Sequence, residues 1–106
     1  MNQEKSIFSK IIDREIPAQI EYEDEKCIVI HDINKKARVH LLIIPKKEIP
    51  TLFALTPQDK DLMAHMMLLL PQLASAQGLD GFKTQINTGE SGGQEVFHLH
   101  IHLLGN

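Results

Sequence analysis

Three histidines near the C-terminus alternate with aliphatic residues, and they are the residues of this sequence best suited to chemistry. His98, His100 and His102 stand two positions apart, and side chains two apart on a β-strand point to the same face. A strand predicted over residues 95–104 would therefore carry three imidazoles on one face. Imidazole has a pKa of about 6.5, so at neutral pH it can attack phosphorus, donate a proton or bind a phosphoryl group. We predict that the middle residue, His100, is the nucleophile, because both neighbours can assist it.

Two other interpretations of the histidine row are weaker. An amphipathic strand needs only polar residues of any kind on its outer face. Chance does not readily place three histidines at strict period two in a chain that has only six. A metal site needs ligands that converge to within about 2 Å of the ion. On a strand, however, His98 and His102 would be about 13 Å apart. We therefore expect neither a metal nor a cofactor.

The loop before the predicted histidine strand is rich in glycine. Backbone N–H groups can approach an anion closely where glycine stands in place of larger residues. The glycines are Gly89, Gly92 and Gly93, and the neutral donors around them are Asn87, Ser91 and Gln94. Because this loop leads directly into the histidines, we predict a phosphate site next to the nucleophile.

Composition limits the classes of protein to which the chain can belong. With 106 residues, 42% of them hydrophobic and 24% charged, it is expected to form one domain over residues 1–106. A formal net charge of −3 gives no reason to expect a nucleic-acid partner. Cys27 is the only cysteine, and no apolar stretch has the length of a membrane span or the pattern of a signal peptide. We expect a cytoplasmic protein that does not bind membranes.

The remaining pattern predicts an α+β fold with a five-stranded antiparallel sheet. A short helix is expected between Ser6 and Pro17, and a long one from Thr56 to Gly78, which Pro71 should bend or destabilise by about 3 kcal/mol. The other four strands are expected over residues 18–24, 26–33, 38–45 and 82–87. The long helix is apolar on more than one face, which fits either deep burial or contact with a second subunit.

The sequence HLHIHLL, residues 98–104, has the pattern His-apolar-His-apolar-His-apolar-apolar that defines the histidine triad family. The resemblance continues through IFSKIIDREIPA, CIVIHDI, HLLIIPKKEI and INTGESGGQEVFHLHIHLLG, and it is greatest to the histidine triad nucleotide-binding (Hint) branch. It implies homodimers in which two five-stranded sheets join into one. It also implies hydrolysis of purine nucleoside phosphoramidates, such as AMP joined to an amine, with release of AMP.

The resemblance also implies a role for individual residues. His100 would form a covalent nucleotidyl intermediate, flanked by His98 and His102, and His40 would support the nucleophile. Asp32 would bind the ribose hydroxyls. The purine would lie against Ile7, Phe8, Ile11, Ile30, Ile33 and Leu42, and the phosphate near Asn87, Gly93, Gln94 and Glu95.

Glu95 departs from the pattern of this branch, which usually has a hydroxyl residue after the glutamine. A carboxylate that pointed inward would repel phosphate. We therefore expect Glu95 either to turn away from the phosphate or to change the leaving-group preference, in favour of a cationic amine.

Two alternative functions fit the same fold, namely a dinucleoside polyphosphate hydrolase and a non-catalytic nucleotide-binding or interaction module.

The two other histidines are not assigned to the site. His31 is expected to be structural or at the edge of the pocket, and His65 to be a packing residue in the long helix.

Overall fold

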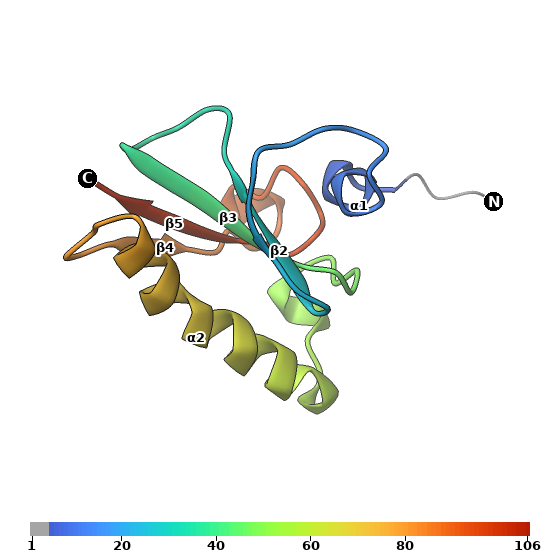
Figure 1. Cartoon of the computed structure of the whole chain (residues 1–106). Coiled ribbons are helices and arrows are strands. Elements are labelled where there is room, and N and C mark those ends of the chain that lie inside the picture. Colours follow the sequence, from blue (N-terminus) through green and yellow to red (C-terminus); the bar gives the residue numbers. More distant parts are fainter. Residues whose placement is uncertain (1–4) are drawn as a thin grey trace.

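The computed structural model describes residues 5–106 and contains one layer of strands with helices on both sides (Figure 1). Its five strands form an antiparallel sheet in the order β1-β2-β3-β5-β4, which confirms the predicted α+β class. The strands are β1 (Ile20–Glu23), β2 (Cys27–His31), β3 (Val39–Pro45), β4 (Lys83–Gln85) and β5 (Ile101–Gly105). The helices are α1 (Ile7–Ile12) and α2 (Lys60–Ala76), with 3-10 turns η1 (Leu52–Ala54), η2 (Pro57–Asp59) and η3 (Glu90–Gly92).

The pairing register divides the side chains of the sheet between two faces. Ile30 is opposite Leu42, and Leu42 is opposite His102, so these three side chains share one face. Alternation along each strand then sends the odd-numbered residues of β2, β3 and β5 to the other face. Each face therefore has its own hydrophobic core. His40 and His102 lie on the even-numbered face, whereas His31, at the end of β2, lies on the other face.

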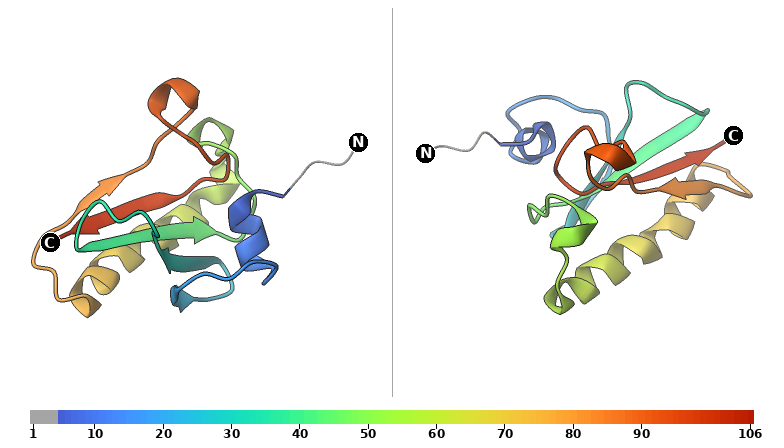
Figure 2. Two further views of the ribbon diagram at one scale, coloured as in Figure 1. Left: turned by 90° about the horizontal axis from the view of Figure 1, so that it is seen from above. Right: turned by 180° about the vertical axis from the view of Figure 1, so that it is seen from behind.

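Helix α2 covers the odd-numbered face, and α1 covers part of the even-numbered face (Figure 2). The core under α2 contains the fully buried Val29, Leu41, Ile43, Met66, Ile101 and Leu103. The smaller core under α1 contains Phe8, Ile11, Ile28, Ile30, Leu42 and Ile44. Because α1 has only six residues, it leaves the β3–β5 part of its face free of helix, and a site can form there.

The long helix starts as its sequence predicts, although its first turn is a 3-10 turn. Thr56 and Asp59 form a capping box around η2, and Asp59 Oδ2 accepts a hydrogen bond from the Thr56 amide at 3.0 Å. Pro71 lies inside α2, which continues through it to Ala76. Since Pro71 is exposed, the carbonyl four residues earlier that lacks its helical partner lies on the solvent side, which limits the expected penalty.

The predicted strand over residues 95–104 is wrong in its first half, because β5 begins only at Ile101. The chain before it makes hydrogen bonds outside the sheet. The Leu99 amide donates to the Ile49 carbonyl at 2.6 Å, and the His98 carbonyl accepts from the ring of His100 at 2.8 Å. Residues 95–100 therefore form an irregular segment, and β4 is likewise shorter than the predicted strand 82–87.

No helix among residues 5–106 has both the length and the apolar character needed to cross a bilayer.

Replacing Met66 by alanine tests the core between α2 and the sheet. Met66 is fully buried, so Met66→Ala should lower the free energy of unfolding by about 2–5 kcal/mol. Urea unfolding at pH 7 measures the change. Gln72→Ala, at an exposed position of the same helix, should change it by less than about 0.5 kcal/mol. Equal losses in both variants would contradict this assignment of the core.

Candidate functional site

His40 and His102 lie side by side on the even-numbered face and form the inner part of the site. Their strands pair directly, and His40 Nε2 is 2.9 Å from His102 Nδ1. His40 Nδ1 accepts a hydrogen bond from the Lys36 amide at 3.1 Å, and Asp32 Oδ2 is 3.4 Å from His40 Nε2. Asp32 itself is held by its own amide, which donates to the His40 carbonyl at 2.9 Å. The structure thus brings Asp32, the residue predicted to bind the ribose hydroxyls, to the edge of the histidine pair.

These contacts determine which nitrogen carries the proton in each neutral ring. The Lys36 amide can only donate, so His40 Nδ1 is an acceptor and the proton of neutral His40 is on Nε2. That proton is donated to His102 Nδ1. The proton of neutral His102 is consequently on Nε2, away from His40. His102 therefore has an N–H group available to a substrate.

His100 stands one residue before β5, with its ring next to that of His102. The centroids of the two rings are 5.0 Å apart, and the ring of Phe8 meets His100 edge-on at 4.9 Å. Its Nδ1 is 2.8 Å from the His98 carbonyl, which can only accept, so Nδ1 carries the proton. The lone pair of His100 is left on Nε2. This tautomer is the one that a nucleophilic imidazole needs.

Burial keeps the histidines of the site neutral. It lowers the pKa of His40 and of His100 below the ordinary value. The pKa of His102 falls to about 4, first through burial and then through the neighbouring His100 and His40. A flanking histidine could act as a phosphate partner through its positive charge only if it were protonated. In the free protein His102 is neutral at pH 7 instead.

His98 lies on the α1 side of the sheet with His100, because Phe8 contacts both rings, while Leu99 between them packs in the core under α2. The His98 ring is fully buried. Nε2 donates to the Pro45 carbonyl at 2.8 Å, and Nδ1 accepts from the Ser6 hydroxyl at 2.8 Å. Both ring nitrogens are occupied within the protein, so His98 contacts His100 through its backbone carbonyl. Sequence spacing does not reveal the Ser6 contact, although the same serine is identifiable as a helix cap.

The glycine-rich loop is shaped by two amide side chains. Gly89 and Gly93 have φ of +75° and +87°, which glycine adopts without strain. The buried Gln94 accepts from the Gly89 amide at 2.9 Å and donates to the carbonyls of Pro50 and Val96 at 2.7 and 2.9 Å. Asn87 donates to the Gly92 carbonyl at 2.9 Å. Both amide side chains are thus engaged with the chain itself, and the backbone N–H groups of Gly89, Gly92, Gly93 and Gln94 also donate within the loop.

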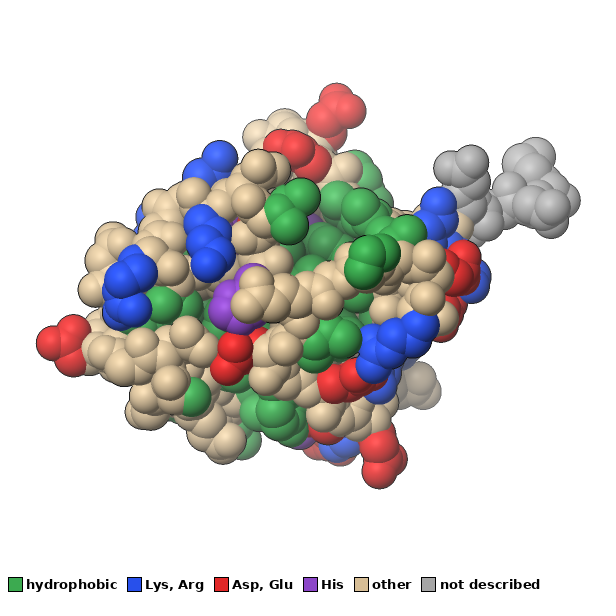
Figure 3. Space-filling view, turned by 45° about the horizontal axis from the view of Figure 1, so that its top comes forward, with side chains coloured by type: hydrophobic (Ala, Val, Ile, Leu, Met, Phe, Trp, Pro, Cys, Tyr) green, Lys and Arg blue, Asp and Glu red, His purple; other side chains and the backbone are tan. Residues whose placement is uncertain are grey.

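The residues predicted to contact the purine fall into two groups. Four of them, Phe8, Ile11, Ile30 and Leu42, are buried together in the core under α1. Ile7 is 50% exposed and Ile33 is 95% exposed. In the space-filling view a histidine reaches the surface beside hydrophobic side chains, with an acidic group next to it (Figure 3). The apolar floor and its two exposed neighbours thus provide a surface on which a flat base can lie.

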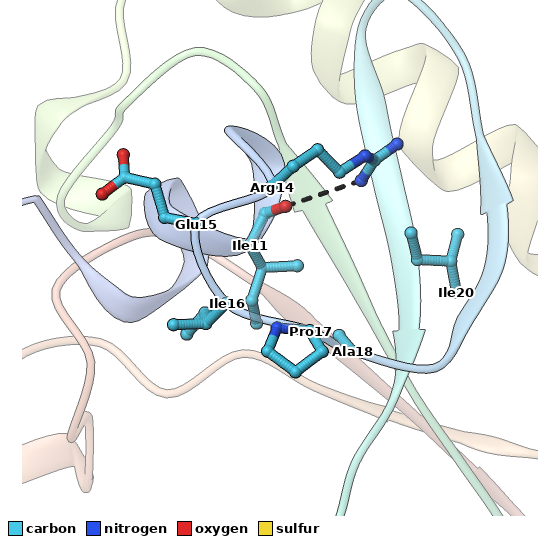
Figure 4. A pocket seen from close by; sticks show the side chains of 7 residues that line it. All are labelled: Ile11, Arg14, Glu15, Ile16, Pro17, Ala18 and Ile20. Carbon is cyan, nitrogen blue, oxygen red and sulfur yellow. Dashed lines mark hydrogen bonds between the residues drawn. The ribbon is translucent and has the colours of Figure 1, made fainter.

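Two hollows adjoin this region. One, of about 290 Å³, lies under the turn after α1, is lined by Ile11, Arg14, Glu15, Ile16, Pro17, Ala18 and Ile20, and contains no histidine (Figure 4). The other, of about 590 Å³, is lined by Lys5, Ser6, Ile7, Glu48, Pro50, Glu95, Val96 and Phe97. The second hollow joins the exposed Ile7 to the segment that leads into His98. Glu95 therefore faces this cleft.

Among residues 5–106, two groups of side chains could hold a metal ion. Donor atoms of Asp32, His40 and His102 lie within 4.8 Å of one another, as do those of Asp24, Cys27 and His65. The first group comes from three separate segments, a convergence that spacing along one strand does not reveal. The second includes a hydrogen bond of 2.6 Å between His65 Nε2 and Asp24 Oδ2. His65 therefore links α2 to the β1–β2 turn and is not a simple packing residue. His31 is paired elsewhere, with its Nε2 2.8 Å from Glu21 Oε1.

Known proteins similar to this chain agree in family and fold. The family model described as "Scavenger mRNA decapping enzyme C-term binding" matches residues 5–106. Protein HitA of Neisseria gonorrhoeae is 54% identical over 100 residues, 93% of this chain and 94% of that protein. A HIT family hydrolase from Legionella pneumophila superposes with a TM-score of 0.94 at 41% identity, covering 96% of this chain and 93% of that one. A HIT family hydrolase from Clostridium thermocellum gives 0.94 at 40% identity, covering 99% and 93%.

The neutral state of His102 can be measured directly. Its NMR ring resonances, identified by their loss in His102→Gln, should titrate with a pKa of about 4. An unfolded histidine titrates at about 6.5, so between these values the unfolded chain binds more protons. The stability contributed by His102 should be complete above pH 6.5 and decrease as the pH falls towards 4.

Urea unfolding at pH 7 and pH 5 tests the same point. The wild type should lose more stability between pH 7 and pH 5 than His102→Gln does. The lowered pKa values of His40 and His100 also reduce stability as the pH falls, but they do so in both proteins. A His102 pKa at or above 6.5 would contradict the electrostatic description of the site.

Proposed function

Because the chain belongs to the histidine triad (HIT) family, we propose that it acts as a purine nucleoside phosphoramidase of the Hint branch. Its substrates would be AMP amides and related acyl adenylates, hydrolysed to AMP through a covalent bond between phosphorus and His100. The observation that carries the proposal is the hydrogen bond from His100 Nδ1 to the His98 carbonyl at 2.8 Å. It leaves the lone pair on Nε2 of a ring that burial keeps neutral.

The first step forms the bond from His100 Nε2 to phosphorus and breaks the bond from phosphorus to the leaving nitrogen. The negative phosphoryl group raises the proton affinity of the His40–His102 pair, and the Asp32 carboxylate, 3.4 Å from His40, acts in the same direction. The protonated pair gives a proton from His102 Nε2 to the departing amine. His102 is neutral after this step.

The second step hydrolyses the intermediate. Water attacks phosphorus while His102 Nε2 takes its proton, and the bond from phosphorus to His100 breaks. His100 returns to its neutral form and AMP leaves. The pair of His40 and His102 therefore acts first as an acid and then as a base.

Binding of the nucleotide follows from the surroundings of these histidines. Asp32 would accept hydrogen bonds from the two ribose hydroxyls. The base would lie on Phe8, Ile11, Ile30 and Leu42, between the exposed Ile7 and Ile33. The phosphate would lie near Gly93 and be held by the backbone N–H group of Glu95, because the Gly93 amide donates to the Glu90 carbonyl and Asn87 and Gln94 use their amide groups to shape the loop.

A homodimer is part of the proposal. Strand β4 is at the edge of the sheet, and all three of its residues are exposed. Met67 and Leu68 on α2 are 49% and 68% exposed, and Phe82 beside β4 is 41% exposed. A second copy that paired along β4 would extend the sheet and cover these apolar side chains.

Removal of the nucleophile is the central test. Purified protein should release AMP from adenosine 5′-phosphoramidate, and His100→Ala should be slower by about 1000-fold or more, equivalent to about 4 kcal/mol of barrier. Intact-protein mass spectrometry should detect an adenylyl adduct on the wild type but not on this variant. His31→Ala, which removes a histidine paired with Glu21, should retain activity. Full activity in His100→Ala would exclude the proposal, and turnover of diadenosine triphosphate alone would favour a dinucleoside polyphosphate hydrolase.

Glu95 is proposed to select the leaving group, because its carboxylate lines the cleft together with Glu48. AMP joined to a diamine keeps a distal ammonium group, whereas AMP joined to an alkylamine of equal length has none. We expect the wild type to prefer the diamine substrate in kcat/KM, and Glu95→Gln to reduce that preference by about 2- to 5-fold, the effect of an exposed ion pair. Glu90→Gln, in η3, is the matched control. A preference unchanged by Glu95→Gln would contradict this role.

A further inference from the structure

We infer that Ser6 is a positioning residue for the nucleophile, acting through His98; the inference rests on the proposed function of His100. The Ser6 hydroxyl is 2.8 Å from His98 Nδ1. The His98 carbonyl is in turn 2.8 Å from His100 Nδ1. A single side chain at the start of α1 is therefore connected to the attacking ring by two hydrogen bonds and one residue of backbone.

The direction of each hydrogen bond follows from its partners. His98 Nε2 faces the Pro45 carbonyl, so it carries a proton and donates. Nδ1 of the neutral ring is then an acceptor and requires a donor. The Ser6 hydroxyl supplies its proton to Nδ1 while its oxygen accepts from the Ser9 amide at 2.9 Å. Ser6 thus caps α1 and determines the tautomer of His98 with one hydroxyl group.

Ser9 is the only other hydroxyl within 3.5 Å of this nitrogen among residues 5–106, and it cannot replace Ser6. Its oxygen is 3.4 Å from His98 Nδ1, and its single proton is donated to Glu48 Oε1 at 2.9 Å. The hydrogen bond from Ser9 to Glu48 instead holds α1 against the chain that follows β3. Ser9 is therefore a matched control for Ser6.

The location of His98 makes its orientation important for His100. His98 is fully buried, so an unpartnered Nδ1 would be costly, and the ring would turn to find another donor. Rotation of this ring would disturb the backbone carbonyl that holds the proton of His100. Phe8, two residues after Ser6, also contacts the ring of His100. Helix α1 therefore supports His100 in two ways, through the ring of Phe8 and through the bond from Ser6 to His98. The second of these sets the tautomer of His100.

Three substitutions separate capping from positioning. Ser6→Ala removes both the cap and the donor to His98. Ser6→Asp keeps a cap, because a carboxylate accepts from the Ser9 amide, but it cannot donate to His98 Nδ1. Ser6→Thr keeps both functions. Ser9→Ala leaves the bond from Ser6 to His98 in place.

The first readout is steady-state kinetics with adenosine 5′-phosphoramidate. We expect kcat to fall by about 10- to 100-fold in Ser6→Ala and in Ser6→Asp, as small displacements of reacting groups do. KM should change by less than about 2-fold. Ser6→Thr and Ser9→Ala should retain wild-type kcat. Normal kcat in Ser6→Ala, or recovery of kcat in Ser6→Asp, would overturn the inference, because the serine would then act only as a cap.

The second readout does not depend on activity. The ¹⁵N chemical shifts of His100 report which ring nitrogen carries the proton. Ser6→Ala and Ser6→Asp should move the Nδ1 signal of His100 away from its protonated position, whereas Ser9→Ala should not. If the wild type hydrolyses no phosphoramidate, the proposed enzymatic function fails, but these shifts still decide the role of Ser6. Unchanged His100 shifts in both Ser6 variants would exclude it.

Discussion

The pairing of β3 with β5 is the constraint on which the site depends. It sets Leu42 opposite His102 and so places His40 and His102 on one face. The alternate residues of the same strands enter the core under α2. A slip of one residue would exchange the two sets, burying imidazoles under α2 and exposing aliphatic side chains beside the glycine-rich loop. The hydrophobic effect thus fixes the register, and the register fixes the distance between the two histidines.

Burial has a second effect, on charge. Three clustered imidazoles would repel one another if protonated, and removal from water adds to the cost of that charge. Burial is the main cause of the lowered pKa values of His40, His100 and His102, and neighbouring imidazoles lower the pKa of His100 and His102 further. In the proposed reaction, the neutral cluster would offer a nitrogen lone pair to phosphorus, and its affinity for a proton would increase when the phosphate binds.

Much of this arrangement could be predicted from the sequence, for physical reasons. Alternating hydrophobicity gave the approximate positions of the strands, and Thr56 with Pro57 indicated the start of the long helix. The alternation of the histidines with Leu99, Ile101 and Leu103 holds, since these three aliphatic residues share the core under α2, but of the three histidines only His102 lies within β5. Residues 95–100 make their hydrogen bonds to Ile49, to His100 and to the Gln94 side chain instead. Such contacts leave no periodic signal, and the same is true of the contact between Ser6 and His98, 92 residues apart.

The irregular segment has a consequence for how such a protein can change. His100 belongs to neither the sheet nor the loop, and the bond from the Leu99 amide to Ile49 anchors the chain between them. Substitutions in residues 88–97 can therefore alter what the cleft accepts, while the strand register and the histidine pair stay as they are. Under the proposed function, substrate range and reaction chemistry would reside in adjacent but mechanically separate parts of the chain, so selection could act on the first without disturbing the second.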